Sequence, residues 1–147
     1  MDDVISQRAG AAFDSGFRCA ESVLLSVAEG KGIQSDFIPR IATGFCGGIS
    51  RTGNICGAVA GAVMAINLFY GRMDPSIPIE ENYAKVQELV QRFDAMYGTT
   101  SCKALIGCDL STAEGRAYFK DNNLLDRCRQ ITVQATQMAM EIIEPTF

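Results

Sequence analysis

The sequence predicts an all-α domain of six or seven helices packed around a buried central helix that is rich in glycine and alanine. Apolar residues recur at three- and four-residue steps along most of the chain, which is the spacing of one face of a helix. Glycine or proline separates these runs, and no stretch shows the alternation of a strand. Residues 1–147 are expected to form one domain, because this length can bury a core of its own.

Two helices are predicted in the first thirty residues. Residues 3–14 carry apolar side chains at helical spacing, and Gly16 interrupts the pattern. The second helix covers about 19–29, and a Gly-Lys-Gly sequence at 30–32 ends it. A short third helix is expected to begin at Asp36, whose side chain can act as an N-cap.

The central stretch, residues 44–71, reads as a glycine-rich loop followed by an apolar helix. The loop surrounds Arg51, and no further charged residue occurs before Arg72. Asn54 is the expected N-cap of this helix, which places Cys56 in its first turn. The stretch is therefore expected to place Cys56 at the start of a buried helix.

Gly57 and Gly61 lie four residues apart on one face of the central helix. Small residues at that spacing let another backbone or a bound group come close, so we expect a second helix to cross there. A membrane span is the alternative, since the uncharged stretch is long enough. However, its continuous apolar part, residues 55–66, has a length that favours a core helix.

The carboxy-terminal half is predicted to contain four helical segments. They are expected over residues 79–97, over a turn or short helix at 102–107, from Ser111 or Thr112 to about Lys120, and from Asp126 to about Ile143. In the last segment Asp126 is the expected cap, and Cys128 falls on the buried face.

The composition excludes several classes of function. The chain contains no histidine, which rules out a Cys–His or Ser–His mechanism within it and removes the usual nitrogen ligand of zinc or haem. A net charge of −4 without a basic cluster argues against nucleic acid as a partner. The acidic start lacks an apolar signal region, so we expect a cytoplasmic protein without a membrane span.

Six cysteines are the main candidates for function, and a reducing cytosol favours free, metal-bound or redox-active thiols over structural disulfides. Four of them fall at predicted helix starts, where unpaired N–H groups and the helix dipole favour a thiolate: Cys19, Cys56, Cys102 and Cys128. This placement predicts lowered thiol pKa values. The alternative is that each cysteine simply fills space in the core.

The glycine loop supplies a second group of candidates. Gly47, Gly48, Arg51 and Gly57 could surround a bound anion or cofactor beside Cys56. No strand precedes the loop, so a phosphate-binding loop of the nucleotide-binding type is not favoured.

Five segments of the chain also resemble a known family. They are CAESVL from Cys19, the GG-x-x-R-x-G loop, CGAVAG at residues 56–61, CKALIGCDLS from Cys102, and a last helix that opens with Cys128. This combination resembles the C_GCAxxG_C_C family of redox-active proteins, whose signature is CGAxxG. Carried over, the family cysteines are Cys19, Cys56, Cys102 and Cys128, with Cys108 as a fifth candidate. Cys46 stands where relatives are expected to have glycine, so it is interpreted as incidental.

We expect the four cysteines to face one pocket near the glycine loop, with Cys108 at its rim. They would hold a labile iron–sulfur cluster or another soft metal, or act as a thiol/disulfide relay. Relatives are often encoded near transporters, and a similar domain occurs in split-Soret cytochromes c, where an iron–sulfur site has been proposed. No haem is expected here, because the chain has no CxxCH sequence.

Several alternatives stay open at this point. The partner would be an electron-transfer or transporter-associated protein that the sequence does not identify, and a homodimer is also open. A non-catalytic accessory module that binds a metal or small ligand is the second hypothesis, and a structural helical domain with buried thiols is the third. Cysteines far apart in the core would favour the third, since a packed interior could not bring them to a shared site.

Overall fold

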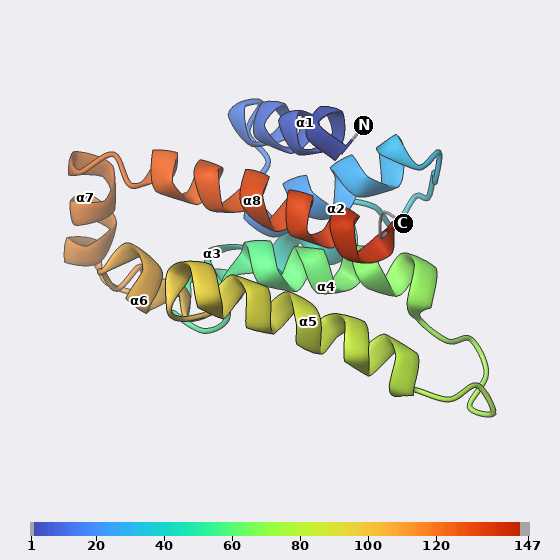
Figure 1. Cartoon of the computed structure of the whole chain (residues 1–147). Helices are drawn as coiled ribbons and strands as arrows, with labels where there is room; N and C mark the ends of the chain where they lie inside the picture. The colour runs from blue at the N-terminus through green and yellow to red at the C-terminus, as the bar shows by residue number, and fades with distance from the viewer. Residues whose placement is uncertain (1, 145–147) are drawn as a thin grey trace.

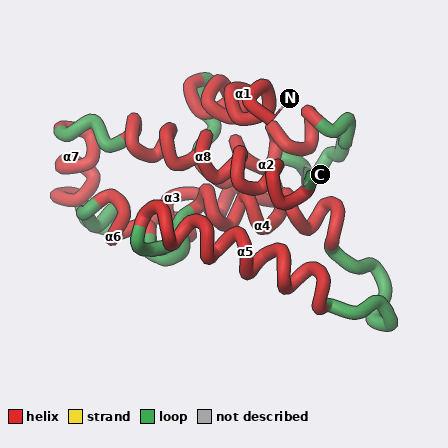
Figure 2. The backbone as a smooth tube through the Cα atoms, in the orientation of Figure 1, coloured by secondary structure: helices red, strands yellow, loops and turns green. Residues whose placement is uncertain are grey.

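The computed structural model describes residues 2–144. In these residues all the regular elements are helices, joined by loops, and no strand is formed (Figures 1 and 2). The elements are α1 (Asp2–Asp14), α2 (Cys19–Gly30), the 3-10 helix η1 (Arg40–Phe45), α3 (Cys46–Arg51), α4 (Gly57–Tyr70), α5 (Glu80–Tyr97), α6 (Cys102–Ile106), α7 (Ala113–Asp121) and α8 (Leu125–Ile143). The all-α prediction is confirmed. The described residues contain more helices than the six or seven expected, because the segment that leads into the glycine loop forms η1 and the loop itself coils at α3.

The central helix is α4, as the sequence predicts. It packs against α2, α5 and α8 (Figure 1). Most of its first ten residues are buried, and its apolar side chains join one core with Val27 of α2, Phe93 of α5 and Met140 of α8. Within residues 2–144 no helix has both the length and the apolar character needed to cross a bilayer.

The close crossing expected on the glycine face of α4 is confirmed, and the crossing helix is α2. A Cβ atom added at Gly61 would lie 2.7 Å from the carbonyl oxygen of Ala20 and 3.1 Å from the Cβ of Val23. Contacts this short leave no room for a side chain, so glycine is what allows the two backbones to approach.

Two expected helix starts are wrong. No α-helix begins at Asp36, and the chain makes turns there before the 3-10 helix η1. Pro39 explains this, because the residue before a proline is disfavoured in the α conformation. Asp126 does not cap α8 either. It lies in the first turn and accepts a hydrogen bond from the side chain of Asn123.

Asn54 is also not the cap of α4. Its carbonyl oxygen accepts a hydrogen bond from the backbone N–H of Cys102, and its side chain donates to Thr52. The chain stays extended through this contact, so α4 begins one residue after Cys56, which occupies the N-cap position.

The segment labelled α3 is a left-handed turn. Five consecutive residues, Gly47 to Arg51, have positive φ angles between 53° and 71°. This region suits glycine but is unfavourable for other residues, and Ile49, with φ of 62°, is the least suited because it is β-branched. The turn is held by the hydroxyl groups of Ser50 and Thr52, which donate to the carbonyl oxygens of Gly44 and Gly48 at 2.9 Å.

Candidate functional site

A cavity of about 600 Å³ lies where the amino-terminal ends of α2, α4 and α6 meet the first turn of α8. Five cysteines line it: Cys19, Cys46, Cys56, Cys102 and Cys128. We call this space the cysteine cavity. The four cysteines singled out from the sequence are therefore brought together, each from a different helix start.

The other sequence candidates divide into two sets. Gly47, Arg51 and Gly57 line the cysteine cavity, whereas Gly48 and Cys108 do not. Gly48 instead lies against Cys102, because a Cβ atom at this position would collide with the Cβ of that cysteine. Cys108 is half-buried beyond the end of α6.

Cys46 is the lining residue that the sequence interpretation missed. The sequence interprets it as incidental, but the structure places it in the cavity, where it and Cys19 both lie against Gly57. The signal that could have pointed to it is its place directly before Gly47, in the same loop as Arg51, since both are candidates for the site.

A backbone contact between two distant segments places Cys56 and Cys102. Ile55 and Ser101 form an isolated antiparallel bridge, in which Cys56 N donates to Thr100 O and Cys102 N donates to Asn54 O, both at 2.7 Å. In such a pairing, residues on either side of the bridged pair point to the same face. Cys56 and Cys102 therefore project into the cavity together.

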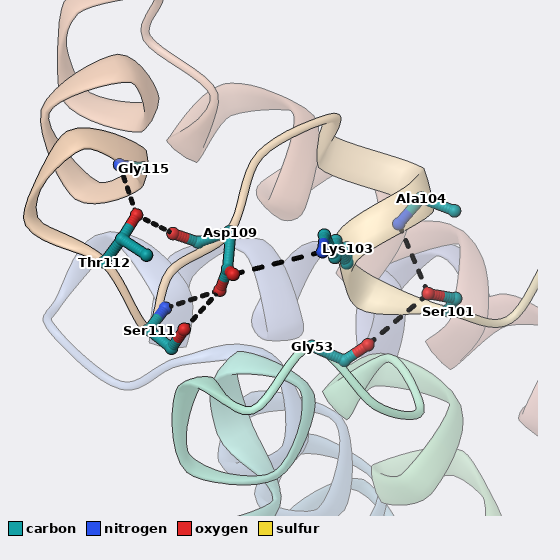
Figure 3. A network of polar contacts seen from close by, with 8 residues as sticks. All are labelled: Gly53, Ser101, Lys103, Ala104, Asp109, Ser111, Thr112 and Gly115. Carbon is teal, nitrogen blue, oxygen red and sulfur yellow. Dashed lines mark hydrogen bonds and ion pairs between the residues drawn. The ribbon is translucent and has the colours of Figure 1, made fainter.

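Figure 3 shows the polar contacts that hold α6 next to this bridge. The Ser101 hydroxyl donates to the carbonyl oxygen of Gly53 at 3.4 Å and accepts from the backbone N–H of Ala104 at 3.2 Å. Ser101 is thus the N-cap of α6, which confirms a helix start immediately before Cys102.

The same network sets the start of α7 (Figure 3). The Asp109 carboxylate accepts from the backbone and hydroxyl of Ser111 at 2.9 and 2.6 Å, and Thr112 caps α7 by accepting from Gly115 N at 2.9 Å. A side chain at Gly115 would collide with the carbonyl oxygen of Asp109. This tight connection brings Arg116 to the cavity wall.

Cys19 and Cys46 form a pair on one side of the cavity. A hydrogen bond to Cys19, reinforced by burial, raises the pKa of Cys46 far above its ordinary value. Gly57 makes room for both residues, because a Cβ atom there would collide with Cys19 Sγ and lie 3.2 Å from Cys46 Cα. The Sγ of Cys46 also lies 3.8 Å from Oε1 of Glu21, in the first turn of α2.

Cys56, Cys102 and Cys128 form the other set, which we call the three-thiol group. Burial raises the pKa of Cys56 to about 11 and that of Cys128 to about 12. Neighbouring cysteines act in the same direction: Cys102 on Cys56, and both of these on Cys128. Burial also raises the pKa of Cys102. The expected lowering of pKa at these helix starts is therefore wrong, because desolvation outweighs the helix ends.

The side chains do not fit a bound metal ion in this arrangement. Within residues 2–144, no three or more Cys, Asp or Glu side chains are grouped closely enough to hold one. Four thiolates on one tetrahedral metal would need sulfur atoms about 3.8 Å apart, given sulfur–metal distances of about 2.3 Å. The cysteines share a cavity without forming such a shell.

Comparison with known proteins places this arrangement in a family. Residues 17–142 match the family described as "Putative redox-active protein (C_GCAxxG_C_C)". The chain belongs to this family. It is also similar to an uncharacterized protein of Archaeoglobus fulgidus, with 31% identity over 127 residues that cover 80% of this chain and 83% of that protein. No solved structure matches the chain. The matched region contains all six cysteines and all the lining residues of the cavity except Phe13.

Proposed function

We propose that this protein is a thiol/disulfide redox protein that exchanges disulfides in its cysteine cavity. The observation that carries the proposal is the convergence of five of the six cysteines on one cavity, where Cys19 Sγ and the backbone of Cys46 both lie against Gly57. The redox description of the family supports it. An iron–sulfur cluster has weaker support, since the thiols are not grouped as ligands within residues 2–144.

Cys19 is the attacking residue in this proposal. Cys46 is the partner that stays protonated, because its thiol donates to the Glu21 carboxylate at 3.8 Å and to the carbonyl oxygen of Ala42 at 3.9 Å. Cys19 is half-buried at the first residue of α2. The Cys19 thiolate attacks one sulfur of a substrate disulfide, a mixed disulfide forms, and one substrate thiolate leaves. Cys46 then completes the exchange.

The second step needs a proton acceptor for Cys46, and Glu21 is placed for it, 3.8 Å from the sulfur. Cys46 loses its proton and attacks the Cys19 sulfur, so that a Cys19–Cys46 disulfide forms and the second substrate thiolate leaves. One substrate disulfide becomes two thiols, and the two thiol protons of the protein pass to those products. Two of the three thiols of Cys56, Cys102 and Cys128 would then accept the disulfide from this pair by the same exchange.

The test is a single-turnover reaction of the fully reduced protein with 2-hydroxyethyl disulfide under anaerobic conditions. We expect release of two small thiols per exchange, and a rate at least about tenfold lower in Cys19→Ser, because the attacking thiol is gone. The matched control is Cys108→Ser, whose thiol does not line the cavity and whose rate should stay close to that of the unmodified protein. An unreactive native protein, or a Cys19→Ser variant that reacts as fast, would contradict the proposal.

A further inference from the structure

Three arginines line the cysteine cavity: Arg18, Arg51 and Arg116. We call them the arginine rim, because all three side chains are exposed. In the part of the chain that the structure describes, no aspartate or glutamate lines this cavity. The protein as a whole carries a net charge of −4, so the cavity mouth is positive on a negative molecule. Such a local field attracts anions and repels cations.

The rim arginines have no acidic partner among the described side chains. The Arg18 guanidinium donates only to the carbonyl oxygen of Phe17, at 3.3 Å, and stacks on Phe13. The Arg116 guanidinium donates to the carbonyl oxygen of Leu110 at 3.0 Å. By contrast, Arg129 makes a two-pronged contact with Asp14 at 2.8 and 2.9 Å. The rim therefore keeps guanidinium donors free for an incoming group.

One carboxylate lies close to the pair of cysteines, and it is already engaged. Glu21 accepts from the backbone N–H of Arg18 at 3.1 Å and from the Thr43 hydroxyl at 2.9 Å. It does not line the cavity and makes no ion pair with a rim arginine. Its charge therefore does not occupy the guanidinium groups.

The rest of the cavity is suited to a small organic body. Its volume of about 600 Å³ falls within the range of small-molecule sites, about 300–1,000 Å³. Apolar side chains from four helices and one connecting segment form much of its wall, including Phe13, Leu105, Leu110, Phe119 and Ile131. A ligand with a short apolar chain and charged ends matches this combination.

We infer that the substrates of the cysteine cavity are small organic disulfides that carry carboxylates, bound by the arginine rim. Guanidinium and carboxylate groups match in geometry and charge, so the rim would hold the acid groups while the disulfide lies against Cys19. This inference rests on the proposed exchange activity and adds the charge of the molecule exchanged.

The test compares three small disulfides that differ mainly in charge: 3,3′-dithiodipropionate, 2-hydroxyethyl disulfide and cystamine. Their second-order rates with reduced protein are measured in the native chain and in an Arg51→Gln/Arg116→Gln variant. We expect the variant to slow dithiodipropionate about tenfold, leave 2-hydroxyethyl disulfide within about twofold, and speed up cystamine. For each disulfide, the rate with the variant is divided by the rate with the native chain, which removes differences in intrinsic reactivity between the disulfides.

Two further variants make the result specific. Arg92→Gln removes an arginine that pairs with Glu88 and Glu141 away from the cavity, so its rates should match those of the native chain. Arg51→Lys keeps the charge and should retain most of the rate with dithiodipropionate. Circular dichroism and melting confirm that each variant is folded. The inference would be overturned if the double variant reacted equally more slowly with all three disulfides, or if its rates matched those of the native chain for all three.

Binding without redox chemistry separates this inference from the proposed function. Suberate is the carbon analogue of dithiodipropionate, and we expect it to protect Cys19 from iodoacetamide in the native chain but not in the double variant. Protection without disulfide exchange would leave the anion site standing and overturn the exchange activity. Disulfide exchange without a charge preference, together with no protection by suberate, would overturn the anion site and leave the exchange activity standing.

Discussion

Each end of the α2–α4 interface has a glycine on α4, and the two glycines serve different purposes. At the crossing end, Gly61 lies against the backbone of Ala20, and the contact leaves no room for a side chain. At the cavity end, one helical turn earlier, Gly57 lies against the thiol of Cys19 and the backbone of Cys46. The first glycine makes room for a helix and the second for sulfur.

The difference shows that one small-residue stripe can serve packing and chemistry together. Because α2 is fixed against α4 at Gly61, Cys19 at the start of α2 is held next to Gly57 and the cavity. Substitutions at the crossing end should therefore affect stability alone, whereas those at the cavity end should also affect reactivity. Three substitutions test this separation.

The largest effect is expected from Gly61→Leu. A leucine would have to displace the backbone of α2, so we expect a loss of unfolding free energy towards or above the top of the usual ~1–3 kcal/mol for overpacking. Chemical denaturation measures it. The control is Ala84→Leu on the exposed face of α5, which should change stability little. A Gly61→Leu protein as stable as the native chain would refute the close crossing.

The next effect concerns Cys56 at the cavity end. Its pKa is raised from 9.0 to about 11 in the folded protein, so the neutral thiol stabilises the fold below pH 9 and this contribution is lost as pH rises from 9 to 11. This rise in pKa corresponds to roughly 3 kcal/mol of unfolding free energy. Cys56→Ala should show a smaller loss of stability over this range. An identical alkaline decline in both proteins would show that Cys56 is not desolvated.

A smaller change in stability is expected from Gly57→Ala, together with a clear change in reactivity. The added methyl group would press on Cys19 Sγ and approach Phe45 O to 2.8 Å, so we expect a loss of about 1–3 kcal/mol and slower closure of the Cys19–Cys46 disulfide. Gly61→Ala is the matched comparison. It should also lower stability while leaving closure nearly as fast, and equal slowing by both would remove the distinction between the two ends.

Sequence periodicity was sufficient for the fold and for much of the site. The helical spacing predicted the helices, and the Gly57/Gly61 stripe predicted the close crossing that α2 makes. The helix-start positions also pointed to four cysteines that line the cavity. These signals are local, or repeat along a helix, which is why one sequence reveals them.

The features that were missed depend on contacts between distant segments. Asn54 looks like a cap, but its carbonyl pairs with Cys102, which keeps the chain extended up to Cys56. The left-handed turn that follows Cys46 has no periodic pattern, so nothing local places that thiol beside Cys19. Burial of the thiols also depends on the packed fold. It raises the thiol pKa values that the helix ends were expected to lower.

Disulfide mapping after oxidation tests the central claim most directly. Reduced protein is treated with 2-hydroxyethyl disulfide, the remaining thiols are alkylated, and the peptides are identified by mass spectrometry without reduction. The account predicts a disulfide between Cys19 and Cys46 as the first product, with Cys108 alkylated. A first disulfide that includes Cys108, or a protein in which Cys19 and Cys46 both remain free thiols, would contradict it.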